Sequence, residues 1–339
     1  MTEQTPVPEY IIDRFGRQMT YLRVSVTDRC NMRCVYCMPP EGIPWQPHET
    51  ILTYEEISTI VKSAALHGIR EVRLTGGEPL IRKNLPDLVR LISAIPEIKS
   101  ISLTTNGLLL ASQAVELKQA GLKRVNISLD TLDSEKFKRI TRGGQLEKVL
   151  DGIHAAEAVG LTPIKINVVA MRGVNENELL DLARLALTHP WQIRFIELMP
   201  LVNPPPPNDE ELVYSSIDQY MPIVEIKKAL ESLNLQPVEE VNGSGPAKLY
   251  AIPGAPGRVG FISPISEHFC ETCNRLRLTA DGSLRSCLLK EFEVPIREAV
   301  KTGMDLLPLF KQAAFLKPEG HELSLDHLPG SRCMRQIGG

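Results

Sequence analysis

Residues 1–200 alternate between short apolar runs of β-strand character and amphipathic stretches of helical spacing, and few folds accommodate that alternation. Six strand–helix units in succession predict a parallel sheet, because parallel neighbours need a long crossover connection that a helix supplies. The expected strands are Tyr21–Val26, Glu71–Thr75, Ser100–Thr104, Arg124–Leu129, Pro163–Ala170 and Ile193–Leu198. The expected helices are Tyr54–Leu66, Leu85–Ala94, Ser112–Ala120, Gly144–Val159 and Glu176–Leu187.

The carboxyl ends of the expected strands carry polar and glycine-rich residues, and their distribution indicates how the sheet is arranged. Such residues follow nearly every strand, whereas a doubly wound sheet concentrates function at one switch point. A complete or partial barrel is therefore favoured over an open doubly wound sheet. Because the unit count stops at six, the expected fold class is α/β, an incomplete (β/α)6 TIM-type barrel.

The rest of the chain follows a different pattern, which predicts a smaller α+β region covering the open side of the barrel. The stiff proline-rich segment Asn203–Asn208 lies before it. We expect an N-terminal extension over 1–20, a partial barrel over 21–220 and a C-terminal region over 221–339. Its expected elements are helices Pro222–Leu233, Val294–Thr302 and Asp305–Phe315, and strands Lys248–Ile252, Arg258–Ile262, Arg275–Leu278 and Leu284–Cys287.

The charge of the chain is nearly balanced, with 38 Lys and Arg against 41 Asp and Glu and a net charge of −3. General nucleic-acid binding and membrane-surface binding are not expected, since both usually need a basic excess. No apolar run approaches the ~18 residues of a membrane span. The first residues resemble neither a secretion signal nor a transit peptide. A cytoplasmic location is expected.

Seven cysteines are present, and six of them form two groups of three that lie far apart in the sequence. An odd number without a signal peptide argues against a disulfide framework and favours metal binding or catalysis. Cys30, Cys34 and Cys37 directly follow the first expected strand, so their thiolates can converge on one soft metal centre. A 4Fe–4S cluster held by three cysteines keeps one iron open, and structural zinc and buried thiols are the alternatives. Cys333 is given no role.

The second group consists of Cys270, Cys273 and Cys287. A hairpin turning at 280–283 would bring Cys287 back beside Cys273. Because His268 precedes Cys270 by two residues, a zinc site of three cysteines and one histidine is an alternative for this group. The remaining histidines are interpreted as surface or core residues: His48, His67, His154, His189, His321 and His327.

The first group resembles the signature of radical S-adenosylmethionine (SAM) enzymes, Cys-x3-Cys-x2-Cys with an aromatic residue before the last cysteine, here Tyr36. Thr75–Pro79 after the second strand is similar to that family's glycine-rich SAM-binding segment. The resemblance implies a full or partial barrel and a 4Fe–4S cluster whose open iron is chelated by SAM. It also implies reductive cleavage of SAM to methionine and a 5′-deoxyadenosyl radical. Glu78 is expected either to accept a hydrogen bond from the SAM amino group or to be a helix-start carboxylate.

Within that superfamily the chain resembles the MoaA family, the GTP 3′,8-cyclases of molybdenum cofactor biosynthesis, from Tyr21 to Gly339. The resemblance rests on Cys-x2-Cys-x13-Cys beginning at Cys270, on the following Cys-x-Arg-x-Arg stretch and on the terminal Gly-Gly. It implies a lyase with a second 4Fe–4S cluster that also has an open iron. The implied reaction converts GTP to (8S)-3′,8-cyclo-7,8-dihydroguanosine 5′-triphosphate, the first step of the pathway. The adenosyl radical would take the C3′ hydrogen of GTP, and the C3′ radical would attack C8.

The family's functional positions carry over onto matching residues of this sequence. The resemblance implies SAM contacts at Tyr36, Gly77, Ser128 and Met199. It implies GTP contacts at Arg23, Arg73, Thr104, Lys165, Arg275, Leu276 and Arg277. Arg275 or Arg277 is expected to assist the final reduction, and Gly338 and Gly339 to reach into the barrel as a catalytic tail. The implied metal ligands are Cys30, Cys34, Cys37, Cys270, Cys273 and Cys287.

Charged side chains within expected strands support an anionic ligand, because a buried charge is costly unless it is paired or bound. Arginine forks suit phosphate oxygens, and Arg275 and Arg277 lie on one face of their strand. The alternative is that these cations pair with barrel carboxylates such as Glu197. The expected partners are GTP, an electron donor of flavodoxin or ferredoxin type, and cyclic pyranopterin monophosphate synthase as the next enzyme, with a homodimer as the expected assembly. The rivals are a peptide-modifying radical SAM enzyme and a zinc-stabilised binding protein.

Overall fold

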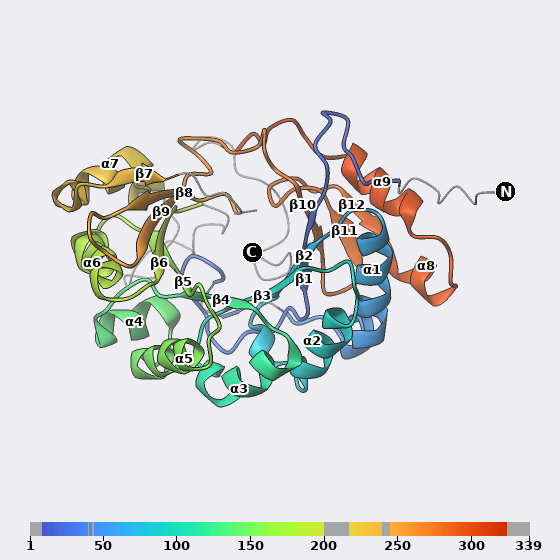
Figure 1. The fold of residues 1–339 in the computed structure, drawn as a ribbon, viewed down its shortest axis with the longest axis horizontal. Coiled ribbons are helices and arrows are strands. Elements are labelled where there is room, and N and C mark those ends of the chain that lie inside the picture. Colours follow the sequence, from blue (N-terminus) through green and yellow to red (C-terminus); the bar gives the residue numbers. More distant parts are fainter. Residues whose placement is uncertain (1–8, 40, 43, 200–216, 239–244, 324–339) are drawn as a thin grey trace.

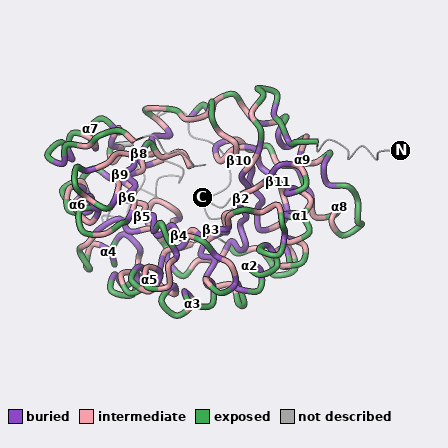
Figure 2. The backbone as a smooth tube through the Cα atoms, viewed as in Figure 1, coloured by how far each residue is buried: buried purple, intermediate pink, exposed green. Residues whose placement is uncertain are grey.

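The computed structural model of the chain describes residues 9–39, 41–42, 44–199, 217–238 and 245–323. A single sheet runs through them in the order β12-β11-β10-β1-β2-β3-β4-β5-β6-β9-β8-β7. Figure 1 shows this sheet curving around a central space, with the helices on its outer side. Figure 2 shows that the strands are largely buried and that the outer faces of the helices are exposed.

The strands of the N-terminal part match the expected runs to within a few residues. Their bounds are β1 Tyr21–Ser25, β2 Glu71–Thr75, β3 Ser100–Thr105, β4 Arg124–Ser128, β5 Lys165–Ala170 and β6 Gln192–Glu197. All neighbours among these six pair in parallel. In the described residues the two edge strands of the whole sheet, β7 and β12, pair only with their inner neighbours. The prediction of an incomplete barrel is therefore confirmed.

The C-terminal region extends this sheet at both edges. Its strands are β7 Gln236–Val238, β8 Lys248–Ala251, β9 Arg258–Ile262, β10 Arg275–Leu278, β11 Ser283–Arg285 and β12 Glu293–Pro295. Strand β10 pairs in parallel with β1, and β9 pairs in parallel with β6, so the parallel part has two more strands than expected. Both strands were expected, but neither belongs to a strand–helix unit. A count of these units therefore left β9 and β10 out of the parallel sheet. The outermost strands of both edges are antiparallel.

The helices confirm the alternation, with one addition. Their bounds are α1 Tyr54–Leu66, α2 Leu85–Ser93, α3 Leu110–Ala120, α4 Ser134–Thr141, α5 Leu146–Ala158, α6 Leu179–Thr188, α7 Ile223–Ala229, α8 Arg297–Lys301 and α9 Leu307–Phe315. Short 3-10 turns lie at His48–Thr50, Pro79–Ile81, Glu176–Glu178, Ile217–Gln219 and Glu231–Leu233. Helix α4 was not expected. The expected helix over Val294–Thr302 was wrong at its start, because residues 293–295 form β12 and the helix begins only at Arg297.

Local signals at the helix ends explain where α1 and α2 begin. Thr53 accepts a hydrogen bond from the Glu56 amide and Glu56 accepts one from the Thr53 amide, which together form a capping box at the start of α1. Asn84 is the N-cap of α2, with φ 58° and no capping hydrogen bond from its side chain.

The core lies between the outer face of the sheet and the helices. Leu22 and Val24 of β1 are fully buried there, and residues at alternate positions of the same strand face the opposite side. Ile11 and Met19 are also fully buried, so residues 9–20 pack onto the barrel. The expected domain limits stay a prediction. No helix in the described part of the chain is long and apolar enough to cross a bilayer.

Candidate functional site

The carboxyl ends of the parallel strands surround one cavity, and both cysteine groups line it. Residues from β1 to β6 and from β9 and β10 contribute to its wall. We call Cys30, Cys34 and Cys37 the first triad, and Cys270, Cys273 and Cys287 the second triad. Segments more than 200 residues apart in the sequence therefore form one site, as expected for a barrel that binds its ligands at the carboxyl ends of its strands.

The first triad lies on the loop after β1, and this loop is fixed by backbone hydrogen bonds. The Cys37 amide donates to the Cys34 carbonyl at 2.9 Å, and the Val35 amide donates to the Ile140 carbonyl of α4 at 3.0 Å. Burial, followed by the neighbouring Cys37 and Cys30, raises the pKa of Cys34 well above its usual value. Thiolates therefore repel one another here, and a bound metal centre would relieve the repulsion. Three soft donors in one loop fit an iron–sulfur cluster.

The glycine pair after β2 packs directly against the start of this loop. A Cβ at Gly76 would lie 2.4 Å from the Thr27 carbonyl oxygen, and one at Gly77 would lie 2.2 Å from the Arg29 carbonyl oxygen. Only glycine allows the backbones to approach so closely. The Gly77 amide then donates to the Thr27 carbonyl at 2.8 Å. Both glycines line the cavity, which brings exposed backbone next to the first triad.

Glu78 is 1% exposed, and its carboxylate is hydrogen-bonded to neighbouring residues. It accepts hydrogen bonds from the Leu80 amide at 3.0 Å, the Thr105 hydroxyl at 2.7 Å and the Asn106 amide at 2.7 Å. Burial raises the pKa of Glu78 to about 7. Its side chain does not line the cavity, which favours the helix-start interpretation over a contact with SAM.

Asn106 connects this carboxylate to the first triad. Its side-chain amide lies 3.9 Å from Cys30 Sγ and donates to Asn31 at 2.8 Å. The Glu78–Asn106 bond thus holds a hydrogen-bond donor beside a sulfur of the first triad. Contacts of this kind orient ligands and tune metal centres.

A buried acid lies beside the first triad and was missed from the sequence. The Tyr36 hydroxyl donates to Asp130 Oδ2 at 2.8 Å, and the Val169 amide donates to Oδ1 at 2.8 Å. Burial raises the pKa of Asp130 to about 6. The segment Asp130–Thr131 follows β4, so the polar residues at that strand end were the available signal. These contacts fix the ring of Tyr36 in the cavity wall.

Four arginines of β1, β2 and β10 also line the cavity wall. We call Arg23, Arg73, Arg275 and Arg277 the arginine row. Pairing of β2, β1 and β10 places Arg73, Arg23 and Arg277 in one register row, and Arg275 lies opposite Tyr21. Burial lowers the pKa of Arg23 well below its usual value, and the charges of Arg277 and Arg73 lower it further. Burial and Arg275 likewise lower the pKa of Arg277 to about 10. Mutual repulsion among buried cations makes this wall a site for an anion.

Several buried polar atoms in the cavity wall have no hydrogen-bond partner among the described residues. The Tyr21 hydroxyl, Thr104 Oγ1 and Asn167 Oδ1 are among them. Buried polar atoms are normally paired, because an unpaired one costs roughly 1–3 kcal/mol. The wall is thus prepared for a polar ligand that supplies these bonds.

The second triad is assembled by the predicted hairpin of β10 and β11. The Cys273 amide donates to the Cys270 carbonyl at 3.0 Å, and Gly282 turns the hairpin with φ 87°. Burial alone would raise the pKa of Cys273, but the charges of Arg275 and Lys317 outweigh it and lower that pKa to about 6. Cys273 therefore favours its thiolate form before any metal binds, whereas burial raises the pKa of Cys270.

Lys317 follows α9 and was not expected at this site. It is 2% exposed, and its ammonium donates to the carbonyls of Arg275 at 2.8 Å and Ser286 at 2.7 Å. It also hydrogen-bonds to Cys273 and so contributes to the lowered pKa of that thiol. No local sequence pattern distinguishes this lysine from a solvated one.

Comparison with known proteins places the chain in a family. The Radical SAM superfamily model matches residues 24–186, and the Molybdenum Cofactor Synthesis C model matches residues 191–323. The GTP 3′,8-cyclase of Moorella thermoacetica is 49% identical over 331 residues, covering 96% of this chain and 99% of that protein. The chain belongs to the GTP 3′,8-cyclase family. The Listeria monocytogenes enzyme of the same name is 46% identical, covering 96% of this chain and 98% of that one.

Solved structures support the fold. Streptococcus suis SuiB superimposes with a TM-score of 0.61 at 14% identity, covering 88% of this chain and 67% of SuiB. SuiB bound to S-adenosylmethionine gives a TM-score of 0.60. At this identity the likeness concerns the fold alone, which agrees with the partial barrel described above.

Most positions carried over from the GTP 3′,8-cyclases lie on the cavity wall. All six triad cysteines do so, as do the expected SAM positions Tyr36, Gly77, Ser128 and Met199 and the expected GTP positions Arg23, Arg73, Thr104, Arg275 and Arg277. Lys165 is buried on the same face of β5 as Asn167 but is not part of the wall. The Leu276 side chain points into the core and is fully buried, so it does not face the cavity. Gly338, Gly339, Cys333 and the segment 203–208 lie outside the described residues.

The structure argues against one alternative from the sequence and adds one residue to the site. Glu197 is not the counter-ion of the arginine row, because it accepts hydrogen bonds from the amides of Ile223, Ile265 and Ser266. Arg194, 2% exposed on β6, lines the cavity and was missed. Asn167 and Arg194 are polar residues at alternate positions of otherwise apolar strands. This pattern was the sequence signal that could have identified both.

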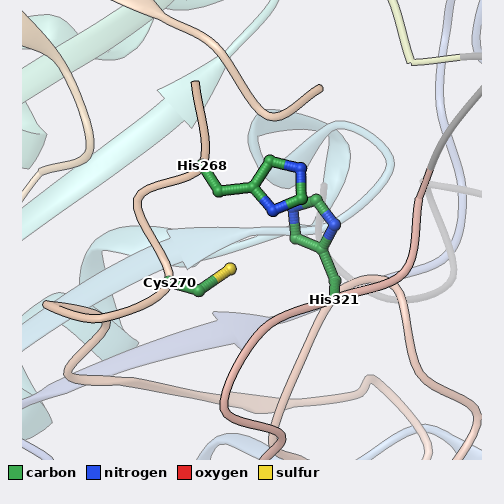
Figure 3. A group of neighbouring side chains, drawn as sticks. All are labelled: His268, Cys270 and His321. Atoms are coloured by element: carbon green, nitrogen blue, oxygen red, sulfur yellow. The ribbon is translucent and has the colours of Figure 1, made fainter. Parts of the chain in front are cut away.

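The histidine interpretation is also corrected at one position. His321 is 8% exposed and lies against His268, with ring centroids 4.4 Å apart. Burial and His268 lower the pKa of His321 to about 4. Figure 3 shows both rings next to Cys270 of the second triad. The sequence indicates that His268 lies near this triad, but it gives no sign that His321 does.

Proposed function

We propose that the chain converts GTP to (8S)-3′,8-cyclo-7,8-dihydroguanosine 5′-triphosphate, acting as a radical SAM lyase in the first step of molybdenum cofactor biosynthesis. One observation carries the proposal. A single cavity is lined by two cysteine triads and by four converging arginines. The relatives named GTP 3′,8-cyclase, which match nearly the whole chain, support it.

The first triad would hold a 4Fe–4S cluster with one iron open to SAM. When bound, the cluster and SAM supply an electron transfer that cleaves SAM to methionine and a 5′-deoxyadenosyl radical. Gly76 and Gly77 present backbone to SAM beside the cysteine loop. Tyr36, fixed by Asp130, and Ser128 and Met199 form the surrounding wall and exclude water.

The arginine row would bind the triphosphate of GTP. Arg23, Arg73, Arg275 and Arg277 supply the positive charge, and guanidinium forks match phosphate oxygens. Thr104 Oγ1 supplies an unused hydrogen-bonding group. Lys165 acts from deeper in the barrel through its charge, and Leu276 takes part only through its backbone. Arg275 or Arg277 stabilises the charge that develops in the final reduction, assisted by the tail Gly338–Gly339.

The second triad would hold a second 4Fe–4S cluster. Cys270, Cys273 and Cys287 line the cavity and would hold this cluster, which would supply a binding site for the guanine edge. Binding there would orient C8 toward C3′, which is a proximity effect. Further parts of the proposal are an electron donor of flavodoxin or ferredoxin type, cyclic pyranopterin monophosphate synthase as the next enzyme, a homodimer and a cytoplasmic location.

The test is anaerobic turnover with GTP, SAM and a reductant. We expect 5′-deoxyadenosine and a cyclised GTP product in equal amounts. GTP carrying deuterium at C3′ should transfer that deuterium to 5′-deoxyadenosine, whereas deuterium at C2′ should stay in the product. Formation of 5′-deoxyadenosine without deuterium transfer from C3′ would contradict the proposed reaction.

A further inference from the structure

A second set of metal-ligand side chains adjoins the second triad. One ligand atom from each of His268, Cys270 and His321 lies within 4.8 Å of the other two. Figure 3 shows the two rings next to each other and the Cys270 sulfur pointing toward them. Only Cys270 is shared with the second triad.

The three residues come from two segments that meet only in the folded chain. His268 and Cys270 lie on the segment before β10, whereas His321 follows α9. His321 lines the cavity, and its Nε2 makes no hydrogen bond within the described residues. His268 is exposed, so an ion can reach the group from solvent.

We propose that His268, Cys270 and His321 bind a divalent ion of the zinc type before the second cluster is assembled. Two imidazole nitrogens and one thiolate are a donor set that zinc accepts, with water as the fourth ligand. Zinc–ligand bonds of about 2.0–2.3 Å place tetrahedral ligand atoms roughly 3.3–3.6 Å apart. Small rotations of the exposed His268 ring and of Cys270 close the remaining gap.

The cost of binding at His321 is small. Its Nδ1 lies 3.3 Å from the Leu323 amide, a long contact. Binding through Nε2 places the ring proton on Nδ1 and gives up this contact. A neutral hydrogen bond of this kind contributes about 1 kcal/mol or less, which a metal–nitrogen bond readily offsets.

The shared cysteine makes zinc and the second cluster mutually exclusive. The ion would occupy Cys270 in the newly made chain, keep that thiolate from oxidation and delay cluster assembly until it is displaced. This consequence rests on the proposed function, because it requires the second triad to hold a cluster. The metal site itself does not require that.

The first measurement isolates the site in the full-length chain. Cys30, Cys34 and Cys37 are replaced by alanine to remove the first triad, and the iron-free protein is titrated anaerobically with Co²⁺ and then with Zn²⁺. We expect one tetrahedral Co²⁺ per chain, with charge-transfer absorption of a single thiolate. Loss of a group that hydrogen-bonds to a metal ligand weakens metal binding about 10–100-fold, and loss of a ligand itself should weaken binding at least as much. The additional change His268→Ala should therefore weaken it by at least about ten-fold.

The control is His154→Ala, which removes an exposed histidine on α5 and should leave binding unchanged. Far-UV circular dichroism checks that each variant folds. Absorption of three-thiolate intensity, unaffected by His268→Ala and His321→Ala, would assign the ion to Cys270, Cys273 and Cys287 and overturn the proposal. So would failure to bind Co²⁺ at all.

The second measurement tests the competition in the same background. Reconstitution with iron and sulfide should give about four irons per chain, the content of one 4Fe–4S cluster. Prior loading with Zn²⁺ should suppress this, and His268→Ala should restore it. If zinc binds as expected but no iron is taken up even without zinc, the site stands and the proposed second cluster is wrong. Full iron uptake in the presence of bound zinc would refute the exclusion.

Discussion

The first and second triads face the same cavity, but Cys34 of the first and Cys273 of the second have charged neighbours of opposite sign. Burial raises the pKa of Cys34, and its neighbours Cys37, Cys30 and Asp130 raise it further. Cys273 has Arg275 and Lys317 beside it, and its pKa is lowered to about 6. Positive surroundings favour the more negative, reduced state of an iron–sulfur cluster. The comparison therefore predicts that the second centre is reduced at a higher potential than the first.

The two triads also differ in how the chain builds them. The first lies within the eight residues 30–37 of the segment between β1 and α1, whereas the second needs the hairpin of β10 and β11 and the segment after α9. A local triad can form as soon as its loop is fixed. The second depends on three segments, so changes far from its cysteines can disturb it.

The largest expected effect is the loss of product formation when a cysteine of either triad is replaced, and it should differ between the two triads. Cys34→Ala and Cys273→Ala should each retain about four of about eight irons per chain, and each should abolish the cyclised product. Cys34→Ala should also abolish 5′-deoxyadenosine, because the proposed function assigns SAM to the first centre. Cys273→Ala should still form it. Iron analysis measures the cluster content, and chromatography measures 5′-deoxyadenosine and the cyclised product. Equal loss of 5′-deoxyadenosine in both variants would contradict the prediction that the two centres have different functions.

The next effect concerns the arginine row. Arg277→Met would remove the proposed charge-assisted contact to phosphate, worth roughly 1.5–3 kcal/mol, so the dissociation constant for GTP should rise about 10–100-fold. SAM binding at the first centre should not change. Isothermal titration of anaerobic protein tests both. The matched control is Arg184→Met, which breaks the exposed ion pair with Asp181.

Lys317 gives a smaller and more selective effect. Lys317→Met keeps the length of the side chain but removes its charge, so the second centre should be reduced only at a more negative potential. The first centre should keep its potential. Redox titration followed by electron paramagnetic resonance separates the two signals. Lys311→Met, which removes an exposed lysine paired with Glu9, is the control and should shift neither centre.

The smallest expected effect lies at the first triad. Asn106→Ala removes the amide that lies 3.9 Å from Cys30 Sγ, and loss of a hydrogen bond to sulfur should make the potential of that centre slightly more negative. Iron content should be unchanged. The same redox titration applies. A shift confined to the second centre would show that the coupling through Glu78 and Asn106 is assigned to the wrong triad.

The sequence predicted what is local or periodic. Apolar runs located β1 to β6, and the spacing of the cysteines identified both triads before any contact was known. The hairpin turn at Gly282 was predicted for the same reason, since its signal lies within a few residues. The side-chain face of Arg275 and Arg277 followed from strand alternation.

What could not be predicted depends on register and on distant neighbours. Arg23 lies beside Arg277 only because β10 joins β1 in parallel, and no pattern in either strand specifies that pairing. Lys317 and His321 reach the second triad from the end of the described chain, with no motif of their own. The family resemblance implies a GTP contact at Leu276, although alternation turns its side chain into the core.

The pairing of β10 with β1 has a consequence for biosynthesis on the ribosome. Tyr21 is opposite Arg275, so the nascent polypeptide must be translated to that point before β1 gains its second neighbour. Until then β1, coloured blue in Figure 1, is an edge strand whose free amide and carbonyl groups are a template for intermolecular β-sheet association. Contacts of such long sequence separation also form slowly. Expression at low temperature, or with chaperones that shield unpaired strands, should therefore raise the recovered yield.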